Sequence, residues 1–458
     1  MIELKDILTA SGGQLLQKGE TGFSRITVDS RTTQPGALFV ALSGKRRDGH
    51  QHIPEAIRNG ATGLLVSRKH AKYPSHITII QVSDGYRALE KIASQISQIW
   101  GKEFIAVTGS SGKTTTKEMI AAILGKKYRV FKNEGNLNTE IGVPIALVQL
   151  SPKHQLGVLE LAMQKRGEIR QLAHMIRPKV GVITNIGPAH IAFLKTLGNT
   201  AYAKGELLQE LPPDGVAVLP RDDKHYPTLK KLAKGKRVIT FGLRHGAHVR
   251  AKKIRWSGAS MVIDVELRGK GIFRVQLKTP GLHMVQDALA SIAVGNLYGV
   301  PKKEIQNAIG NFRTIGSRFA LRKRGKLLVI RDEYNANPDS MRHALETLAR
   351  IGKEEHRPTI AVLGDMLELG HSSRTFHADV GRQIRKLGVS HLVALGHDAV
   401  QYVRHARLDG AAYLSKNHRD GARRLCEILL RYRNTPPVVL FKGSRGMQLE
   451  RIAKLARI

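Results

Sequence analysis

The sequence predicts an α/β protein of three domains, and three observations support this class. Short apolar runs that suit buried strands alternate with helix-like segments along the chain. A glycine-rich turn joins one such strand to a helix in the manner of a phosphate-binding loop. The 458 residues correspond to about three domains of ~150 residues each. We expect a small N-terminal α/β domain in residues 1–98, a central P-loop ATPase-like parallel-sheet domain with an added β-hairpin in 99–315, and a doubly wound, Rossmann-like domain in 316–458.

The first domain offers strands but little chemistry. Residues 37–42 and 63–66 are apolar runs that predict buried strands. Ser30 and Arg31 lie in a polar cluster just before a Pro-Gly turn. Surface loops commonly carry such clusters, so these residues alone leave a binding role open.

The central domain opens with the most informative stretch of the chain. Residues 104–107 predict a strand and residues 113–124 a helix, with a glycine-rich turn between them. Backbone N–H groups of such a turn close on phosphate oxygens, and the helix N-terminus favours negative charge. The residues expected to hold a nucleotide phosphate are Gly109, Ser110, Ser111, Gly112, Lys113, Thr114 and Thr115.

Two side chains of this turn have specific expected tasks. Lys113 would reach the outer phosphates, and the Thr114 hydroxyl would bind Mg²⁺. The general phosphate-loop pattern has a glycine five residues before the second glycine, but this chain has Val107 there. Its first glycine, Gly109, comes two residues later. The alternative is an ordinary glycine-rich turn, which the strand-to-helix context disfavours.

Further polar residues follow the next strands of the predicted sheet. Glu160 ends the apolar run 156–162, and His190 comes just after the run 179–187. Because parallel strands present their carboxyl ends at one edge, Glu160 would hold Mg²⁺ beside the phosphate loop. His190 alone suits a loop histidine, while Lys204 and Glu206 alone suit the exposed face of a helix.

The rest of the chain divides into a hairpin region and a second α/β series. Residues 261–267 and 272–277 alternate around a Gly-rich turn and predict a hairpin, followed by a helix near 283–298. Four apolar runs then predict the strands of the last domain, at residues 327–330, 359–363, 391–395 and 438–441. No G-x-G-x-x-G follows them, so the domain is not expected to bind a dinucleotide.

Composition limits the class of protein. The formal charge is +37, from 74 Lys and Arg against 37 Asp and Glu. These residues are spread along the chain without an aromatic-interleaved patch, so we expect a generally basic surface, not a dedicated nucleic-acid site. A basic nucleic-acid-binding ATPase stays as the alternative. Cys426 is the single cysteine, and we see no signal peptide or membrane span, so we expect a cytoplasmic protein. We also expect a monomer.

Motifs in all three domains together resemble the Mur ligases, ATP-dependent enzymes that add amino acids to the UDP-N-acetylmuramoyl peptide precursor of peptidoglycan. The resemblance is strongest to the member that adds D-alanyl-D-alanine. It implies ATP and two Mg²⁺ as cofactors, with UDP-N-acetylmuramoyl-tripeptide and D-alanyl-D-alanine as substrates. A sibling ligase with another acceptor, such as a polyglutamate-type enzyme, is the nearest alternative. The segments that carry the resemblance are residues 29–42, 108–115, 135–144, 184–190, 203–206, 334–341, 363–370 and 442–445.

The resemblance also implies roles for individual residues. Lys113, Glu160, His190 and Lys204 would be catalytic, with one Mg²⁺ on Thr114 and Glu160 and a second on His190 and a carbamylated Lys204. Arg318 would reach the phosphates. Residues near the adenine and ribose would be His283, Asp332, Asn335 and Asn337; substrate-binding residues would be Ser30, Arg31 and Asn138, with Asp365, His377 and Arg445 near the incoming amine.

One departure from the family concerns the adenine. The family's pattern Gly-x-His-Asn-x-x-Asn stands here as Gly281 to Asp287, with Met284 and Asp287 in place of both amides. His283 remains. The sequence therefore leaves open how Met284 and Asp287 affect adenine binding.

Overall fold

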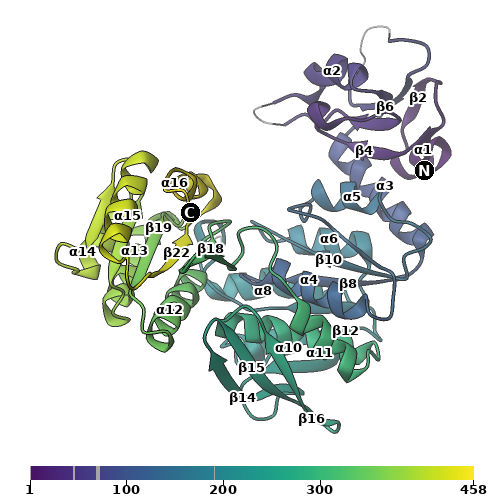
Figure 1. Ribbon diagram of the computed structural model, residues 1–458. Coiled ribbons are helices and arrows are strands. Elements are labelled where there is room, and N and C mark those ends of the chain that lie inside the picture. Colours follow the sequence, from purple (N-terminus) through teal and green to yellow (C-terminus); the bar gives the residue numbers. More distant parts are fainter. Residues whose placement is uncertain (1, 45–46, 69–72, 190) are drawn as a thin grey trace.

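The computed structural model describes residues 2–44, 47–68, 73–189 and 191–458. Within these ranges the chain forms three large sheets in succession, plus a two-stranded sheet of β1 (Ile2–Glu3) and β3 (Gly22–Phe23). Figure 1 shows the N-terminal and C-terminal domains on different sides of the central domain. The predicted α/β architecture of three domains is confirmed, with mainly parallel sheets.

The N-terminal sheet has the order β2-β7-β6-β5-β4, and only its edge strand β2 runs antiparallel. Its central strands are buried, as the apolar runs predicted. The helices α1 and α3 pack together, and α3 also contacts helices of the central domain. The elements are α1 (Leu4–Ser11), β2 (Gln14–Gln17), β4 (Arg25–Thr27), β5 (Ala37–Val40), α2 (Ile53–Arg58), β6 (Ala61–Val66), β7 (Thr78–Gln81) and α3 (Gly85–Trp100).

The central sheet contains nine of the described strands, in the order β16-β15-β14-β13-β12-β11-β8-β10-β9. Strands β9 to β14 pair in parallel, whereas β15 and β16 add an antiparallel end. The predicted hairpin is therefore confirmed, and it extends the same sheet. The strands are β8 (Glu103–Thr108), β9 (Val130–Lys132), β10 (Leu156–Glu160), β11 (Val180–Ile183), β12 (Val216–Pro220), β13 (Arg237–Gly242), β14 (Val249–Ser257), β15 (Ser260–Leu267) and β16 (Gly271–Leu277).

Two helices of the central domain, α4 and α10, carry its site and pack against each other. The helices are α4 (Lys113–Leu124), α5 (Gly142–Leu147), α6 (Glu168–Ile176), α7 (Ile191–Leu194), α8 (Leu197–Gln209), α9 (Tyr226–Leu232), α10 (Leu282–Leu297) and α11 (Lys302–Asn311). Helix α4 packs on α10 in one apolar cluster with the sheet. A Cβ on Gly295 would lie 2.4 Å from Ile123 Cγ2, so this glycine permits the close approach.

The C-terminal sheet has the order β17-β18-β22-β19-β20-β21, parallel except for β17. Its strands are β17 (Ala320–Arg324), β18 (Leu327–Asp332), β19 (Thr359–Gly364), β20 (His391–Leu395), β21 (Ala412–Ser415) and β22 (Val438–Lys442). Its longer helices are α12 (Pro338–Glu354), α13 (Ser373–Lys386), α14 (Val400–Ala406), α15 (His418–Arg431) and α16 (Glu450–Leu455). Strand β17 includes part of a basic run; charged side chains are common on edge strands.

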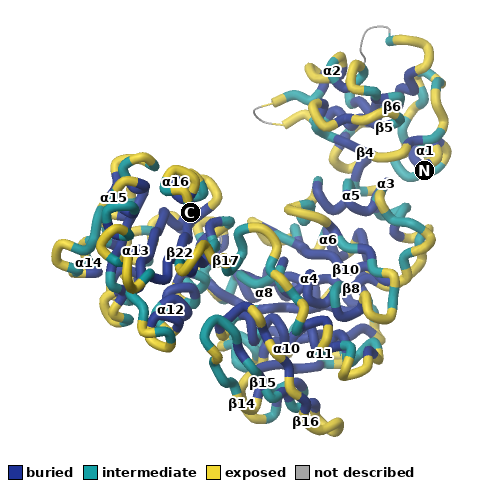
Figure 2. The backbone as a smooth tube through the Cα atoms, in the orientation of Figure 1, coloured by how far each residue is buried: buried dark blue, intermediate teal, exposed yellow. Residues whose placement is uncertain are grey.

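Burial follows the layers of each domain. Figure 2 shows buried residues along the central strands and exposed residues on the outer loops and helix faces. Across the described part of the chain, no helix combines the length and apolarity that crossing a membrane requires.

Candidate active site

The phosphate loop lies between β8 and α4, and its two glycines have left-handed or related backbone angles. Gly109 has φ 155° and Gly112 has φ 77°. A Cβ on Gly109 would lie 1.8 Å from the Thr184 hydroxyl oxygen, so no larger residue fits. The late first glycine is therefore required by the close approach of the neighbouring strand β11.

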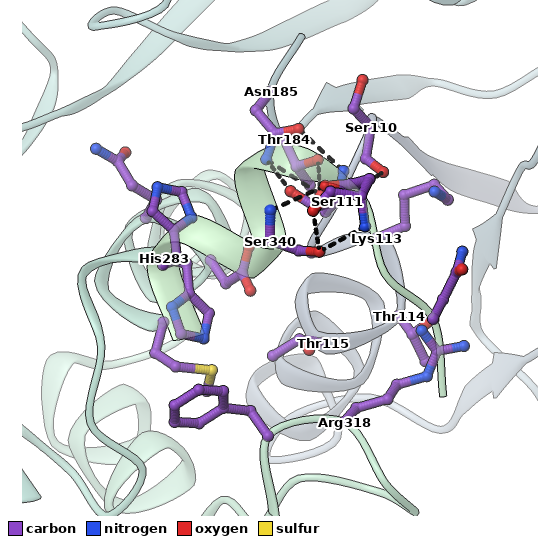
Figure 3. Close-up of a pocket in the computed structure, with 18 of the residues that line it drawn as sticks. Ser110, Ser111, Lys113, Thr114, Thr115, Thr184, Asn185, His283, Arg318 and Ser340 are labelled. Carbon is purple, nitrogen blue, oxygen red and sulfur yellow. Dashed lines mark hydrogen bonds between the residues drawn. The ribbon is translucent and has the colours of Figure 1, made fainter. Parts of the chain in front are cut away.

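Hydrogen bonds fix this loop to the segment that follows β11. Asn185 Oδ1 accepts from the Ser111 N–H at 3.0 Å, and the Thr184 hydroxyl donates to the Ser111 carbonyl at 2.6 Å. The Ser110 hydroxyl donates to the Gly187 carbonyl at 2.9 Å and accepts from the Gly187 N–H at 2.8 Å. Figure 3 shows Thr184 and Asn185 against the loop. The loop is thus held in shape by contacts far apart in sequence.

Lys113 begins α4 and lies within this cradle. Its Nζ donates to the Gly109 carbonyl at 3.0 Å. Burial lowers the pKa of its amino group, and the positive Arg318 lowers it further, while the Glu160 carboxylate acts in the opposite direction. Negative phosphate oxygens beside this buried amine would favour its charged form.

Thr114 and Glu160 form a pair of oxygen donors beside Lys113. The Thr114 hydroxyl donates to Glu160 Oε2 at 2.6 Å, and Asn138 Nδ2 donates to Oε1 at 2.8 Å. Asn133 holds the Glu160 backbone through both its N–H and its carbonyl. A hydroxyl next to a carboxylate suits a hard cation such as Mg²⁺. Among the described residues, no group of three or more His, Cys, Asp or Glu is arranged to hold a metal ion.

Lys204 lies on α8 and is buried, contrary to what its residue type alone suggested. It is 2% exposed, and burial followed by the nearby Lys113 charge holds its pKa well below the usual range. Glu206 was expected at the surface, which is wrong: it is buried and accepts from the Gly167 and Arg170 N–H groups at the start of α6. His190 lies outside the described residues.

All of the predicted nucleotide-binding residues except Gly109 line one pocket of about 390 Å³ between the two domains. Asn337 caps α12, and its Nδ2 donates to the Ser110 carbonyl at 3.5 Å. Figure 3 shows Arg318 and Ser340 beside the phosphate loop. The predicted residues that share this pocket are Ser110, Ser111, Gly112, Lys113, Thr114, Thr115, His283, Arg318, Asp332, Asn335 and Asn337.

Asp332 accepts hydrogen bonds near the segment that joins the central and C-terminal domains. Its Oδ1 accepts from the Phe319 N–H at 3.0 Å, and its Oδ2 accepts from Lys442, which is 1% exposed. Phe319 has φ 56°, which is unusual for a residue with a side chain. Arg318 lies 3.8 Å from the Tyr334 ring centroid. The sequence analysis did not predict Lys442 as a pocket residue. Its position at the carboxyl end of a parallel strand could have indicated it, because ligands bind at that edge of such sheets.

Asp287 lines the same pocket, and no cation among the described residues pairs with it. Its Oδ1 accepts from the Thr116 hydroxyl at 3.1 Å, and a Cβ on Gly112 would lie 2.3 Å from that oxygen. Burial raises the pKa of this carboxyl to about 8. A neutral acid thus lies against the phosphate loop, where an ionised one would repel an anion.

The other predicted residues lie outside this pocket. Ser30 donates to Glu55, and Arg31 pairs with Asp29 on the N-terminal domain. Arg445 pairs with Glu450 in the C-terminal domain. Their proximity to a substrate stays a prediction.

His377 and Asp365 adjoin each other at the end of β19. His377 is fully buried; its Nδ1 donates to the Ser373 carbonyl and its Nε2 accepts from the Met366 N–H. Both ring nitrogens are occupied, so this geometry does not support direct contact of His377 with an amine. Asp365 Oδ1 is buried, lies 3.6 Å from His377 Nε2, and accepts no hydrogen bond from the described residues. Of the two, Asp365 is the better placed for a ligand.

A parallel sheet ending in a phosphate loop, with a hydroxyl–carboxylate pair beside it, defines a P-loop enzyme that acts on a nucleotide phosphate. Three family models match the chain. They are the Mur ligase family catalytic domain at residues 23–97, the Mur ligase middle domain at 107–295, and the Mur ligase glutamate ligase domain at 317–445. Each match lies within one predicted domain, whose limits stay a prediction.

Relatives and solved structures agree with these matches. The UDP-N-acetylmuramoyl-tripeptide--D-alanyl-D-alanine ligase of Bacillus subtilis is 32% identical over 447 residues, which cover 96% of this chain and 94% of the relative. The Escherichia coli ligase of the same name is 30% identical over 457 residues, covering 99% and 97%. A crystal structure of MurF from Acinetobacter baumannii superposes with TM-score 0.92 at 30% identity, covering 100% and 99%. MurF from Thermotoga maritima in complex with ADP gives 0.82 at 29% identity, covering 94% and 96%.

The chain belongs to the Mur ligase family. It is an ATP-dependent, amide-forming ligase, and the fold and the phosphate loop described above are those of this family.

Proposed function

We propose that this ligase joins D-alanyl-D-alanine to the terminal carboxylate of UDP-N-acetylmuramoyl-tripeptide in peptidoglycan precursor synthesis. The observation that carries the proposal is the hydrogen bond from Thr114 to Glu160, because Thr114 lines the pocket of both domains together with Lys113. The relatives named above bear this activity in their names.

The reaction needs two displacements. An oxygen of the tripeptide carboxylate attacks the γ-phosphorus of ATP, the bond to the β–γ bridging oxygen breaks, and ADP leaves. The amine of D-alanyl-D-alanine then attacks the acyl carbon, phosphate leaves, and the amine loses a proton. Attack of one anion on another requires charge neutralisation and alignment.

The residues of this chain supply both requirements. Lys113 places a cation at the outer phosphates, and the loop N–H groups bind their oxygens. Thr114 and Glu160 would hold one Mg²⁺, and His190 with Lys204 a second. These ions neutralise phosphate charge when bound. Arg318 brings a further cation from the domain boundary.

Lys204 would serve a cation after carbamylation. Its depressed pKa leaves the amine neutral at lower pH than an exposed lysine. The neutral nitrogen attacks CO₂, one carbon–oxygen π bond opens, and a nitrogen proton is released to solvent. The product presents oxygens, which suit Mg²⁺ better than an ammonium does.

The outer domains would deliver the two substrates. Ser30, Arg31 and Asn138 are proposed to seat the UDP-linked substrate, and Asp365 and Arg445 to lie near the incoming amine, with His377 as a positioning residue behind Asp365. Closure of the domains around the crevice would bring these groups together. We propose a monomer that acts in the cytoplasm.

Phosphate release with each substrate omitted in turn tests the proposal. Purified protein should release phosphate from ATP only when UDP-N-acetylmuramoyl-tripeptide and D-alanyl-D-alanine are both present. Equal release without D-alanyl-D-alanine contradicts it, and preference for another amino acid or a polyglutamate acceptor indicates a sibling ligase. Stimulation by duplex DNA, lost at high salt, would instead support the nucleic-acid-binding ATPase.

A further inference from the structure

The base-binding end of the nucleotide pocket contains an amide that no family pattern assigns. Gln286 lines this pocket, one helical turn after His283 on α10. Side chains at this spacing share one face of a helix. Figure 3 shows His283 on the opposite side of the pocket from Lys113. With the phosphates at Lys113, the face that carries His283 and Gln286 is where the base would lie.

The orientation of the Gln286 amide is determined by Asp222. Gln286 Nε2 donates to Asp222 Oδ2 at 3.1 Å. Asp222 also accepts from the Leu243 N–H at 2.5 Å and the Arg244 N–H at 3.0 Å, which fix the carboxylate at the β13–β14 turn. A carboxylate only accepts hydrogen bonds, so the amide nitrogen must face it and the amide oxygen must face away.

That oxygen has no partner of its own. Gln286 Oε1 is buried and makes no hydrogen bond with the described residues. A buried acceptor left unpaired destabilises the protein, and a ligand that donates a hydrogen bond to it would remove that cost. Because Gln286 lines the pocket, this oxygen could accept a hydrogen bond from a donor on a ligand bound there.

The surroundings suit a flat, uncharged base. The His283 ring packs edge-on to Phe319 with centroids 4.7 Å apart, and stacks with His343 at 5.8 Å and 8° between planes. Burial, followed by neighbouring charges, holds the pKa of both imidazoles below the usual range. Neutral rings of this kind pack against a nucleobase without attracting a second anion.

We propose that Gln286 Oε1 accepts a hydrogen bond from the 6-amino group of the adenine of ATP, with Asp222 as the residue that positions it. The inference rests on the proposed function, in which ATP is the nucleotide substrate. It also answers the departure at Met284 and Asp287, because the amide carbonyl missing there is supplied from position 286. A 6-oxo purine would set oxygen against oxygen and bind poorly.

Binding of three nucleotides without the other substrates tests this assignment. The probes are ADP, inosine diphosphate, which carries an oxygen in place of the 6-amino group, and purine riboside diphosphate, which carries only hydrogen there. We expect the unaltered protein to prefer ADP by at least about tenfold over either analogue in calorimetric titrations. Gln286→Leu should bind all three within about twofold of one another, because the phosphate contacts stay intact.

Two further variants sharpen the result. Asp222→Asn offers Gln286 a donor, which lets the amide turn its nitrogen to the pocket, so inosine diphosphate should gain on ADP. Gln306→Leu is the matched control. Gln306 lies on the neighbouring helix α11, outside this pocket, and donates to the carbonyl of Arg274 on β16. This variant should keep the original preference for ADP. Each variant is first compared with the unaltered protein by thermal unfolding.

The outcomes separate the two levels of the argument. A base preference that survives in folded Gln286→Leu overturns the role of Gln286 and leaves the proposed function untouched. Failure of the unaltered protein to bind ADP at all overturns the use of ATP, and this inference with it.

Discussion

The Thr114 hydroxyl donates a 2.6 Å hydrogen bond to Glu160 Oε2, which joins the first turn of α4 to the end of β10. Both residues are buried. The carboxylate is further oriented by Asn138, so the two oxygens are preorganised before any cation binds. This contact ties the phosphate loop to the proposed magnesium site.

Glu160→Gln should weaken magnesium-dependent nucleotide binding. The variant keeps the shape of the side chain but removes the charge that a hard cation requires. We expect the Mg²⁺ concentration for half-maximal ADP binding to rise at least about tenfold, while ADP binding without Mg²⁺ changes little. Glu134→Gln, at an exposed position nearby, is the control. An unchanged Mg²⁺ requirement would remove Glu160 from the metal site.

Lys113→Met should abolish turnover without unfolding the protein. The amino group is proposed to neutralise phosphate charge, so phosphate release should fall at least about 100-fold. Removing a partly buried amine whose charge is disfavoured by desolvation should leave the unfolding temperature equal or higher. Lys126→Met, exposed after the same helix, should keep full activity. Near-normal turnover in Lys113→Met would show that the loop does not hold the reacting phosphates.

Local patterns were enough to predict much of this fold. The phosphate loop, the buried parallel strands and the hairpin at β15 and β16 each depend on residues close in sequence. Glu160 could be placed in advance because parallel strands end at a common edge. The part of the candidate site that lies in the central domain, at the phosphate loop and Glu160, was therefore predictable.

Contacts between distant segments could not be predicted in the same way. Glu206 caps a helix that begins near Gly167, and Lys442 pairs with Asp332 across the C-terminal sheet. Nothing adjacent to either residue signals its partner. Likewise, the orientation of the Gln286 amide depends on Asp222, which lies in the turn after β12, far away in the sequence.

Activity should depend on dissolved CO₂ through Lys204. Burial keeps its amine partly neutral, and the neutral amine is the form that accepts CO₂. Degassed, bicarbonate-free enzyme should lose most of its activity and regain it when bicarbonate is added. A carbamate carbon signal should appear in ¹³C NMR with labelled bicarbonate and be absent in Lys204→Arg.

Lys231→Arg, on the exposed end of α9, serves as the control for the NMR signal. Its carbamate signal and its activity should match those of the unaltered protein. Activity that is indifferent to CO₂, together with no carbamate signal, contradicts the proposed role of Lys204.

Asp287 should make the protein less stable as the pH rises from about 4 to about 8. The carboxyl has a pKa near 3.8 when unfolded and about 8 when folded. Between these values the unfolded chain gives up a proton that the folded chain keeps, so the free energy of unfolding falls by about 1.4 kcal/mol per pH unit.

Asp287→Asn keeps the shape of the side chain and cannot ionise. Urea unfolding of both proteins at pH 5 and pH 8 should show the variant gaining stability relative to the unaltered chain at the higher pH. ADP affinity above pH 8 should fall more steeply in the unaltered chain than in Asp287→Asn, because only the unaltered chain then has an ionised carboxylate against Gly112. Parallel stability profiles for the two proteins would mean that Asp287 titrates like an exposed carboxyl.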